Sequence, residues 1–233
     1  MNGDNPRQNV TFPSNGRTAH GYLALPASGQ GPGVIVVQEW WGLTDHVADV
    51  ANRLAGEGFV ALAPDLYGGR TTHDSDEAGR LMQQLPVDQA ARDLVGAVDY
   101  LLEHDAVTGE KVGAVGFCMG GGFVIVLARE AGDRLGAAVP FYGVLGEDYG
   151  DLSTIKAPML GHFAEQDTMA PPEAVRALEQ RIRDQAGVEV TFHIYPGVGH
   201  AFFNDENHMG TYNPEQATIA WERTLDFLRS KLA

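Results

Sequence analysis

The sequence predicts an α/β fold with a mostly parallel β-sheet, and three observations predict it. Short apolar runs alternate along the chain with longer segments of helical period. The apolar runs, such as "VIVV" at 34–37, are continuous rather than alternating, as in strands buried on both faces. The chain has 233 residues, a length that α/β folds often use for one domain. We therefore expect one domain over residues 1–233, with about seven or eight strands and helices on both faces.

The first half of the chain begins with two short strands, at 8–12 and 18–25, which the turn signal "PSNG" separates. The other elements expected before residue 105 are, in order, a strand in "GPGVIVVQEWWG", a helix in "TDHVADVANRLAGEG", a strand in "FVALAPDLY", a loop at 68–76 and helices at 77–85 and 88–104. Thr44 or Asp45 would cap the first helix, and Pro86 separates the last two. Residues 1–7 are expected to form a flexible N-terminal segment.

The second half continues the alternation. Its expected elements are strands in "KVGAVGF", "GAAVPFYG", "APMLGHFAEQD" and "VEVTFHIYPG", and helices in "GGGFVIVLARE", "PPEAVRALEQRIRDQ" and "PEQATIAWERTLDFLRSKL". Functional residues of parallel sheets gather at the carboxyl ends of the strands. The polar or reactive residues that follow predicted strands are Glu39, Asp65, Cys118, Asp167 and His200.

The composition is acidic, with 16 Lys and Arg against 31 Asp and Glu and a formal net charge of -15. That balance argues against binding to nucleic acid or to an anionic membrane, since both need a basic face. The single cysteine excludes an internal disulfide and is typical of a reducing compartment. No secretory signal is visible. We expect a cytoplasmic protein, monomeric or homodimeric.

The segment around that cysteine, "GFCMG" at 116–120, has the pattern of a nucleophile elbow. A predicted strand precedes it and a predicted helix follows, as this tight turn requires. Glycine is needed two positions before and after Cys118, because side chains there would clash with the backbone. The N–H of Met119 would help to bind an oxyanion, and the start of the helix favours a thiolate at Cys118.

Two other interpretations of this segment compete with the elbow. Cys118 could be a small core residue among glycines. Alternatively, Gly116 and Gly121 have the spacing of a phosphate-binding loop, but Gly122 and Phe123 stand where that motif has Lys and Ser or Thr. Without the lysine, the phosphate-binding interpretation is disfavoured.

A nucleophilic cysteine needs a base, and the base needs an orienting group. In the α/β-hydrolase arrangement the chain order is nucleophile, acid, histidine. Cys118, Asp167 and His200 occur in that order, each after a predicted strand. His20, His73 and His208 have no partner that the sequence identifies. There is no H-E-x-x-H motif and no second cysteine, so no metal ligands and no cofactor are expected.

The chain resembles the dienelactone hydrolase family (carboxymethylenebutenolidase-like) of the α/β-hydrolases. The resemblance runs from about residue 18 to the C-terminus. Its matching pieces are "QEWWGL" at 38–43, "APDLYGG" at 63–69, "GAVGFCMGG" at 113–121, "FYG" at 141–143, "EQD" at 165–167, "YPGVGHAF" at 195–202 and "RTLDFL" at 223–228. It implies the α/β-hydrolase fold, with Cys118 as nucleophile, His200 as base and Asp167 as its orienting group.

The resemblance also implies roles for two residues after the early strand. Glu39 would accept a hydrogen bond from the resting thiol and discourage its ionisation until a substrate arrives, because like charges oppose each other. The N–H of Trp40 would be the second oxyanion donor.

The substrate-binding part of the resemblance is incomplete. Family members bind an acidic substrate through two arginines. Arg80, in the stretch "DEAGR", matches the first, but Asn204 stands where the second would be. Trp41 and Phe202 suggest a broad apolar pocket, although each could equally be a packing residue.

These observations predict a hydrolase of a small carboxylic ester or lactone that forms a thioester on Cys118. Two alternatives stay open at this point. One is a broad-specificity carboxylesterase for uncharged esters, and the other is a non-catalytic thiol sensor on the same fold.

Overall fold

The computed structural model describes residues 7–146 and 149–232, and its elements alternate as the sequence predicts. The strands are β1 (Val10–Ser14), β2 (Arg17–Ala24), β3 (Gly31–Val37), β4 (Val60–Pro64), β5 (Val107–Phe117), β6 (Leu135–Phe141), β7 (Met159–Ala164) and β8 (Val190–Tyr195). The helices are α1 (Asp45–Gly56), α2 (Ser75–Gln84), α3 (Val87–Glu103), α4 (Met119–Ala131), the short 3₁₀ helix η1 (Gly132–Arg134), α5 (Pro172–Ala186) and α6 (Pro214–Leu232). The sequence predicts a flexible segment at residues 1–7, and residues 1–6 of it lie outside the described part of the chain.

Two local predictions differ from the structure in detail. The N-terminal hairpin turns at Asn15 and Gly16, both with positive φ, so Pro13 and Ser14 belong to β1 instead of the turn. An Asn-Gly pair suits this tight turn because both residues tolerate a left-handed backbone. Thr44 does stand at the N-cap of α1, but its side chain makes no capping hydrogen bond.

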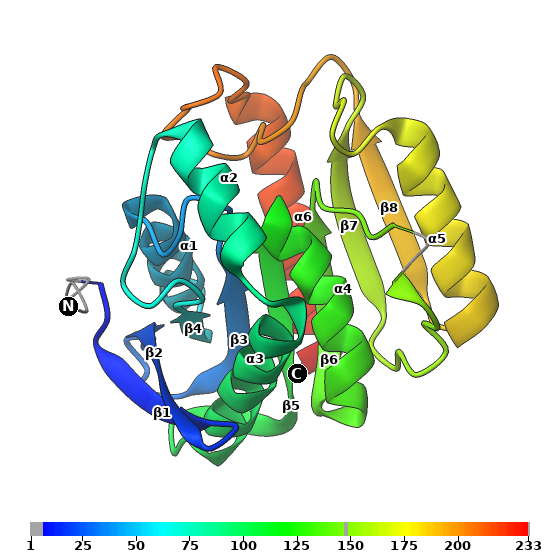
Figure 1. Ribbon diagram of the computed structural model, residues 1–233. Coiled ribbons are helices and arrows are strands. Elements are labelled where there is room, and N and C mark those ends of the chain that lie inside the picture. Colours follow the sequence, from blue (N-terminus) through cyan, green and yellow to red (C-terminus); the bar gives the residue numbers. More distant parts are fainter. Residues whose placement is uncertain (1–6, 147–148, 233) are drawn as a thin grey trace.

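The eight strands form one sheet in the order β1-β2-β4-β3-β5-β6-β7-β8 (Figure 1). β1 and β2 are antiparallel to their neighbours, whereas the pairs from β4 to β8 are parallel. The expected mostly parallel sheet with helices on both faces is therefore confirmed, and the fold is that of the α/β-hydrolases.

The chain reverses its direction of travel across the sheet at β3. After β3 it moves to β4 on one side, and then crosses back to β5 on the other side. Open α/β sheets bind their ligands at the carboxyl ends of the strands beside such a switch point. The ends of β3 and β5 carry Glu39 and Cys118, so the topology brings these two candidates to one edge of the sheet.

Each face of the sheet has its own apolar core. One core packs alternate residues of β3, such as Ile35 and Val37, against α3, α4 and α5. The other packs Val34 and Val36 against α1 and α6. Figure 1 shows α3, α4 and α5 in front of the sheet and α6 behind it. Because both faces are covered, the strand ends are the places where polar side chains of the sheet gather. No helix in the described part of the chain is long and apolar enough to cross a bilayer.

Candidate active site

Cys118 lies on a strained turn between β5 and α4. Its backbone has φ 55 and ψ -116, a region that non-glycine residues rarely adopt. A Cβ atom on Gly116 would lie 2.3 Å from the carbonyl oxygen of Gly120, and a Cβ on Gly120 would lie 2.4 Å from the carbonyl oxygens of Val37 and Gln38. The turn is therefore possible only with glycine two positions before and after the cysteine.

Neighbouring backbone holds this turn in place. The N–H of Cys118 donates to the carbonyl of Phe141 at 3.0 Å, at the end of β6. A Cβ on Gly143 would lie 2.3 Å from the carbonyl oxygen of Cys118. The end of β6 thus packs directly against the nucleophile turn, which offsets the cost of its unusual backbone conformation.

Asp167 and His200 form a buried pair. His200 Nδ1 lies 2.7 Å from Asp167 Oδ2, across 33 residues of sequence. The other carboxylate oxygen, Oδ1, accepts from the N–H groups of Met169 at 2.8 Å and Ala170 at 3.0 Å. Both side chains are almost fully buried. This arrangement orients the imidazole so that Nε2, and not Nδ1, is available to a reacting group.

The protonation of this pair follows from its surroundings. Burial alone would lower the pKa of His200, but the hydrogen bond to Asp167 and the neighbouring Cys118 outweigh it and raise the pKa to about 10. Burial alone would raise the pKa of Asp167, but the hydrogen bond from His200 and the two backbone donors hold it below its ordinary value. His200 Nε2 is buried and has no hydrogen-bond partner among the described residues. Because Nδ1 binds Asp167, Nε2 is the nitrogen that remains for a reacting group, and Cys118 lies close enough to help raise the pKa of the ring.

Glu39 is also buried, and two neutral side chains bind its carboxylate. Asn204 donates to Oε2 at 2.7 Å, and the Tyr142 hydroxyl donates to Oε1 at 3.3 Å. Within the described residues, no hydrogen bond joins Glu39 to Cys118, which is the bond that the resemblance implied. Asn204, at the position of the second family arginine, therefore contacts Glu39 instead of an open substrate site.

Tyr142 is a residue of this site to which the sequence analysis assigned no role. It follows β6 directly, has a positive φ of 38, and packs edge-on against His200 with ring centroids 5.0 Å apart. Burial and then the charges of Glu39, Cys118 and Asp167 raise its pKa well above the ordinary value, so the hydroxyl keeps its proton. Its place at the carboxyl end of a strand is the signal that could have identified it.

The two candidate oxyanion donors lie on opposite sides of the nucleophile in sequence. Met119 is the first residue of α4, so no carbonyl of that helix accepts from its N–H. Trp40 follows Glu39 in the loop after β3, whose last carbonyls border the first turn of α4. The loop that carries Trp40 therefore lies beside the helix start that carries Met119.

A cavity of about 320 Å³ opens beside Cys118. Its lining is mainly apolar and comes from the end of α2, the start of α3, α4 and the segment after β6. The lining includes Leu85, Met119, Phe123, Val126, Val144 and Leu145. No charged side chain of the described residues lines this cavity.

The other predicted substrate-binding side chains lie elsewhere. Phe202 is fully buried and packs on Tyr142 and Tyr195. Trp41 is buried, and its ring lies against the rings of Trp40, His73 and His208. Arg80 is exposed and forms an ion pair with Glu77, one turn away on α2, at 2.9 Å. The structure does not bring these three residues into the cavity with Cys118.

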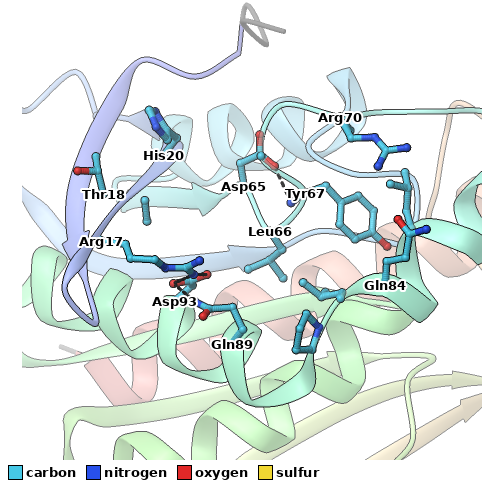
Figure 2. Close-up of a pocket in the computed structure, with 15 residues that line it drawn as sticks. Arg17, Thr18, His20, Asp65, Leu66, Tyr67, Arg70, Gln84, Gln89 and Asp93 are labelled. Atoms are coloured by element: carbon cyan, nitrogen blue, oxygen red, sulfur yellow. Dashed lines mark hydrogen bonds and ion pairs between the residues drawn. The ribbon is translucent and has the colours of Figure 1, made fainter. Parts of the chain in front are cut away.

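A second pocket of about 380 Å³ is lined by both polar and apolar side chains and does not include the cysteine (Figure 2). Two arginines line it, but Arg17 pairs with Asp93, and Arg70 pairs with Glu77. Figure 2 shows the Tyr67 ring at the end of the pocket that Arg70 and Gln84 line.

The two pockets adjoin. Leu85 lines both of them. The Tyr67 hydroxyl donates to the Met119 sulfur at 3.4 Å, and burial together with nearby Cys118 raises the pKa of Tyr67. Tyr67 therefore lies between this second pocket and the first turn of α4, which follows the nucleophile.

Comparison with known proteins places these features in a family. Residues 19–232 match the family model described as "Dienelactone hydrolase family". A protein named usf from Aquifex pyrophilus is 37% identical over 231 residues, which cover 97% of this chain and 99% of the relative. A protein from Aquifex aeolicus that is named as a carboxymethylenebutenolidase is 33% identical, with the same coverage of both chains.

A solved structure gives the same result for the fold. A protein described as a dienelactone hydrolase from Klebsiella pneumoniae superposes with a TM-score of 0.82 at 31% sequence identity. The superposition covers 94% of this chain and 96% of that one. The similarity therefore spans nearly the whole chain, not the nucleophile turn alone.

Proposed function

The chain belongs to the dienelactone hydrolase family and is an enzyme that hydrolyses esters or lactones, and on that premise we propose that Cys118 is its nucleophile. One observation carries this proposal. The cysteine stands on a strained turn for which the flanking glycines leave room. Beside it lies the buried His200–Asp167 pair, in which His200 Nε2 has no hydrogen-bond partner among the described residues. This combination of nucleophile, base and orienting group is the one that acyl transfer requires.

The first half of the reaction begins when the Cys118 thiol gives its proton to His200, and it ends with a thioester. The Cys118 thiolate attacks the carbonyl carbon, and the carbonyl oxygen becomes an oxyanion that the N–H groups of Trp40 and Met119 stabilise. His200, protonated at this stage, gives its proton to the leaving alkoxide as the carbon–oxygen bond breaks. The raised pKa of His200 supports this step, because it favours the imidazolium form beside the sulfur.

The second half regenerates the Cys118 thiolate and the His200 imidazolium. His200 takes a proton from water, the hydroxide attacks the thioester, and the carboxylic acid leaves as Cys118 recovers its thiolate. Asp167 stays ionised throughout, which its lowered pKa supports, and stabilises the imidazolium each time that it forms. No cofactor takes part in either half.

We propose that Glu39 disfavours ionisation of the thiol in the resting enzyme. The charges of Glu39 and Cys118 both help to raise the pKa of Tyr142, so the carboxylate and the sulfur lie near the same ring. A buried negative charge at that distance opposes a second one. The protonated thiol is oxidised less readily, because the thiolate is the form that reacts with oxidants. A single reduced cysteine of this kind fits the cytoplasm as the compartment.

The substrate side of the site favours uncharged esters or lactones with an apolar group. The cavity beside Cys118 is apolar, and Arg80 is held by Glu77 outside it. A substrate carboxylate at Arg80 would have to compete with that ion pair. We therefore propose that the acyl group of the substrate enters the apolar cavity, and that Arg80 contributes little.

The catalytic proposal is tested with a small uncharged aryl ester and two variants. We expect Cys118→Ala and His200→Ala each to lower kcat/KM by at least about 10⁴-fold, as the loss of a nucleophile or base does in related chemistry. Thermal unfolding is the control: Cys118→Ala should keep the wild-type Tm within a few degrees. His200→Ala should melt lower, because buried Asp167 loses its partner, but should still unfold cooperatively. Wild-type turnover in either variant would refute the mechanism.

The cavity proposal is tested with two glycine-to-alanine variants on helices. A Cβ on Gly122 would lie 3.5 and 3.6 Å from Val144 and Leu145, in ordinary contact and inside the cavity, whereas a Cβ on Gly79 of α2 meets nothing within 4 Å. We expect Gly122→Ala to lower kcat/KM for a hexanoyl ester about tenfold relative to the acetyl ester.

Gly79→Ala should leave that ratio unchanged and serves as the matched control. An equal ratio in both variants would show that the acyl group binds elsewhere. Arg80→Ala, assayed with acidic and neutral lactones, reports separately on the acidic-substrate alternative. A selective loss on the acidic lactone would support that alternative.

A further inference from the structure

Two histidines and a glutamate gather at the rim of the molecule, outside the catalytic residues. His73, Glu206 and His208 each offer one ligand atom, and these atoms all lie within 4.8 Å of one another. The two imidazole rings are tilted by 36° relative to each other, with centroids 4.2 Å apart. His73 and His208 are exposed and Glu206 is half-buried, so an ion can reach all three from solvent.

The fold brings these residues together from two separate loops. His73 belongs to the loop between β4 and α2, and Glu206 and His208 belong to the loop between β8 and α6. The buried Trp41 ring lies beside both histidines, with centroids 6.4 and 6.2 Å away. The Trp41 carbonyl also accepts from the N–H of Thr72 at 3.0 Å, which fixes the backbone next to His73. The cluster is thus supported by buried structure underneath it.

The spacing suits a tetrahedral metal centre. Zinc binds imidazole nitrogen at about 2.0–2.1 Å and carboxylate oxygen at about 2.0–2.2 Å, so two of its ligand atoms lie roughly 3.4 Å apart. His208 Nε2 and Glu206 Oε2 are 3.1 Å apart and nearly have that separation. The remaining atoms need to approach by an ångström or so, which rotation of exposed side chains allows.

We propose that His73, Glu206 and His208 bind a divalent transition-metal ion of the zinc class. Two imidazoles and one carboxylate are a donor set for Zn²⁺ or Co²⁺, whereas Mg²⁺ and Ca²⁺ prefer oxygen ligands throughout. Water from the solvent side completes the four ligands. Because the imidazoles must bind through unprotonated nitrogens, binding releases any proton that they carry and weakens in acid.

The bound ion would tie the β4–α2 loop to the β8–α6 loop. The second loop also carries His200 and Asn204, and the N–H of Glu206 donates to Asn204 Oδ1 at 3.0 Å. Asn204 in turn binds Glu39. The ion therefore restrains the loop that positions two residues of the candidate site, without contacting the reacting atoms.

The experiment uses the full chain with Cys118→Ser, which removes the only thiol as a competing ligand. Co²⁺ is titrated while its visible absorption is followed, and Zn²⁺ is titrated by calorimetry. We expect one ion per chain, a tetrahedral Co²⁺ spectrum, and a Tm that rises with Zn²⁺. His73→Ala and His208→Ala, each added to that chain, should raise Kd at least about tenfold.

His20→Ala, on β2 outside the cluster, is the matched control and should bind as the parent does. The proposal is refuted if the parent takes up no Zn²⁺ or Co²⁺ at a hundred micromolar or so. It is equally refuted if the His73→Ala/His208→Ala pair binds with unchanged affinity. A Tm gain that the Glu206→Gln variant retains in full would remove Glu206 from the ligand set and leave a weaker two-histidine site, contrary to the proposal.

Discussion

Asp167 and Glu39 are both buried carboxylates near the nucleophile, with 3% and 2% of their surface exposed, but their partners differ. Asp167 binds His200, a group that can take up a proton, together with two backbone N–H groups. Glu39 binds the neutral side chains of Tyr142 and Asn204. Burial alone therefore does not assign a role to a carboxylate. A carboxylate beside a histidine stabilises the proton that the histidine takes up during the reaction. A carboxylate beside neutral side chains only adds a constant negative charge to the site.

Among the changes that compare the two carboxylates, the largest effect should come from removing the charge of Asp167. We expect Asp167→Asn to lower kcat/KM about 10³–10⁴-fold, because the amide favours the wrong imidazole tautomer and no longer stabilises the imidazolium. Initial rates with a neutral aryl ester measure this. Glu39→Gln assayed in parallel gives the comparison, and an equal loss in both variants would remove the distinction between the two carboxylates.

The second prediction concerns pH and the proton on His200. Its pKa is raised to about 10 in the folded chain, against about 6.5 when unfolded. Between these values the folded state binds more protons, so its stability falls as pH rises. We expect the wild type to lose up to a few kcal/mol relative to His200→Gln between pH 6.5 and 10, measured by urea unfolding.

Cys118→Ser sharpens this pH test. The neighbouring sulfur is one cause of the raised pKa, so the pH-dependent loss of stability should shrink in the serine variant. A slope that stays the same would assign the whole shift to Asp167.

The third prediction tests the neutral partners of Glu39. Asn204→Ala removes a hydrogen bond to a buried charge and should lower the free energy of unfolding by about 1.5–3 kcal/mol. Chemical denaturation measures the loss. Asn52→Ala, which removes an exposed hydrogen bond between amide and Tyr22 hydroxyl, is the control and should cost less than about 1 kcal/mol. Equal costs would mean that Asn204 does not support the carboxylate.

The smallest effect should come from the fixed charge of Glu39 on the thiol. We expect Glu39→Gln to increase the rate of Cys118 alkylation by iodoacetamide about threefold to tenfold at neutral pH, because a nearby negative charge opposes ionisation. Glu57→Gln, which changes an exposed carboxylate paired with Arg229, should leave the rate unchanged. An unaltered rate in Glu39→Gln would contradict the proposed protection of the thiol.

The parts of the site that could be predicted from sequence are those whose requirements are local. The turn at Cys118 needs glycine at fixed short distances, so the pattern around it is diagnostic. Asp167 and His200 follow strands of a parallel sheet, so the topology itself brings them to one edge. The alternation of apolar runs with helical segments, also a local pattern, predicted the sheet and the order of its helices. The exact turn residues of the N-terminal hairpin were missed because they depend on which residues adopt a left-handed backbone.

The rest of the site depends on contacts between distant segments. Asn204 lies 165 residues from Glu39, and no spacing rule links an amide to a carboxylate at that distance. His73 and His208 are likewise unremarkable in sequence, because no local metal motif contains them. Arg80 was matched to a family arginine from the stretch "DEAGR", but whether its side chain faces the cavity or pairs with Glu77 depended on how α2 packs.

The glycines around Cys118 have a consequence for how this enzyme can change. Added side chains at Gly116, Gly120, Gly121 and Gly143 would meet main-chain atoms, which no second substitution can shorten or remove. The cavity, by contrast, is bounded by exchangeable apolar side chains such as Val126 and Leu145. New specificities should therefore be sought, in a randomised library or in natural divergence, by varying the cavity wall while these four glycines are left untouched.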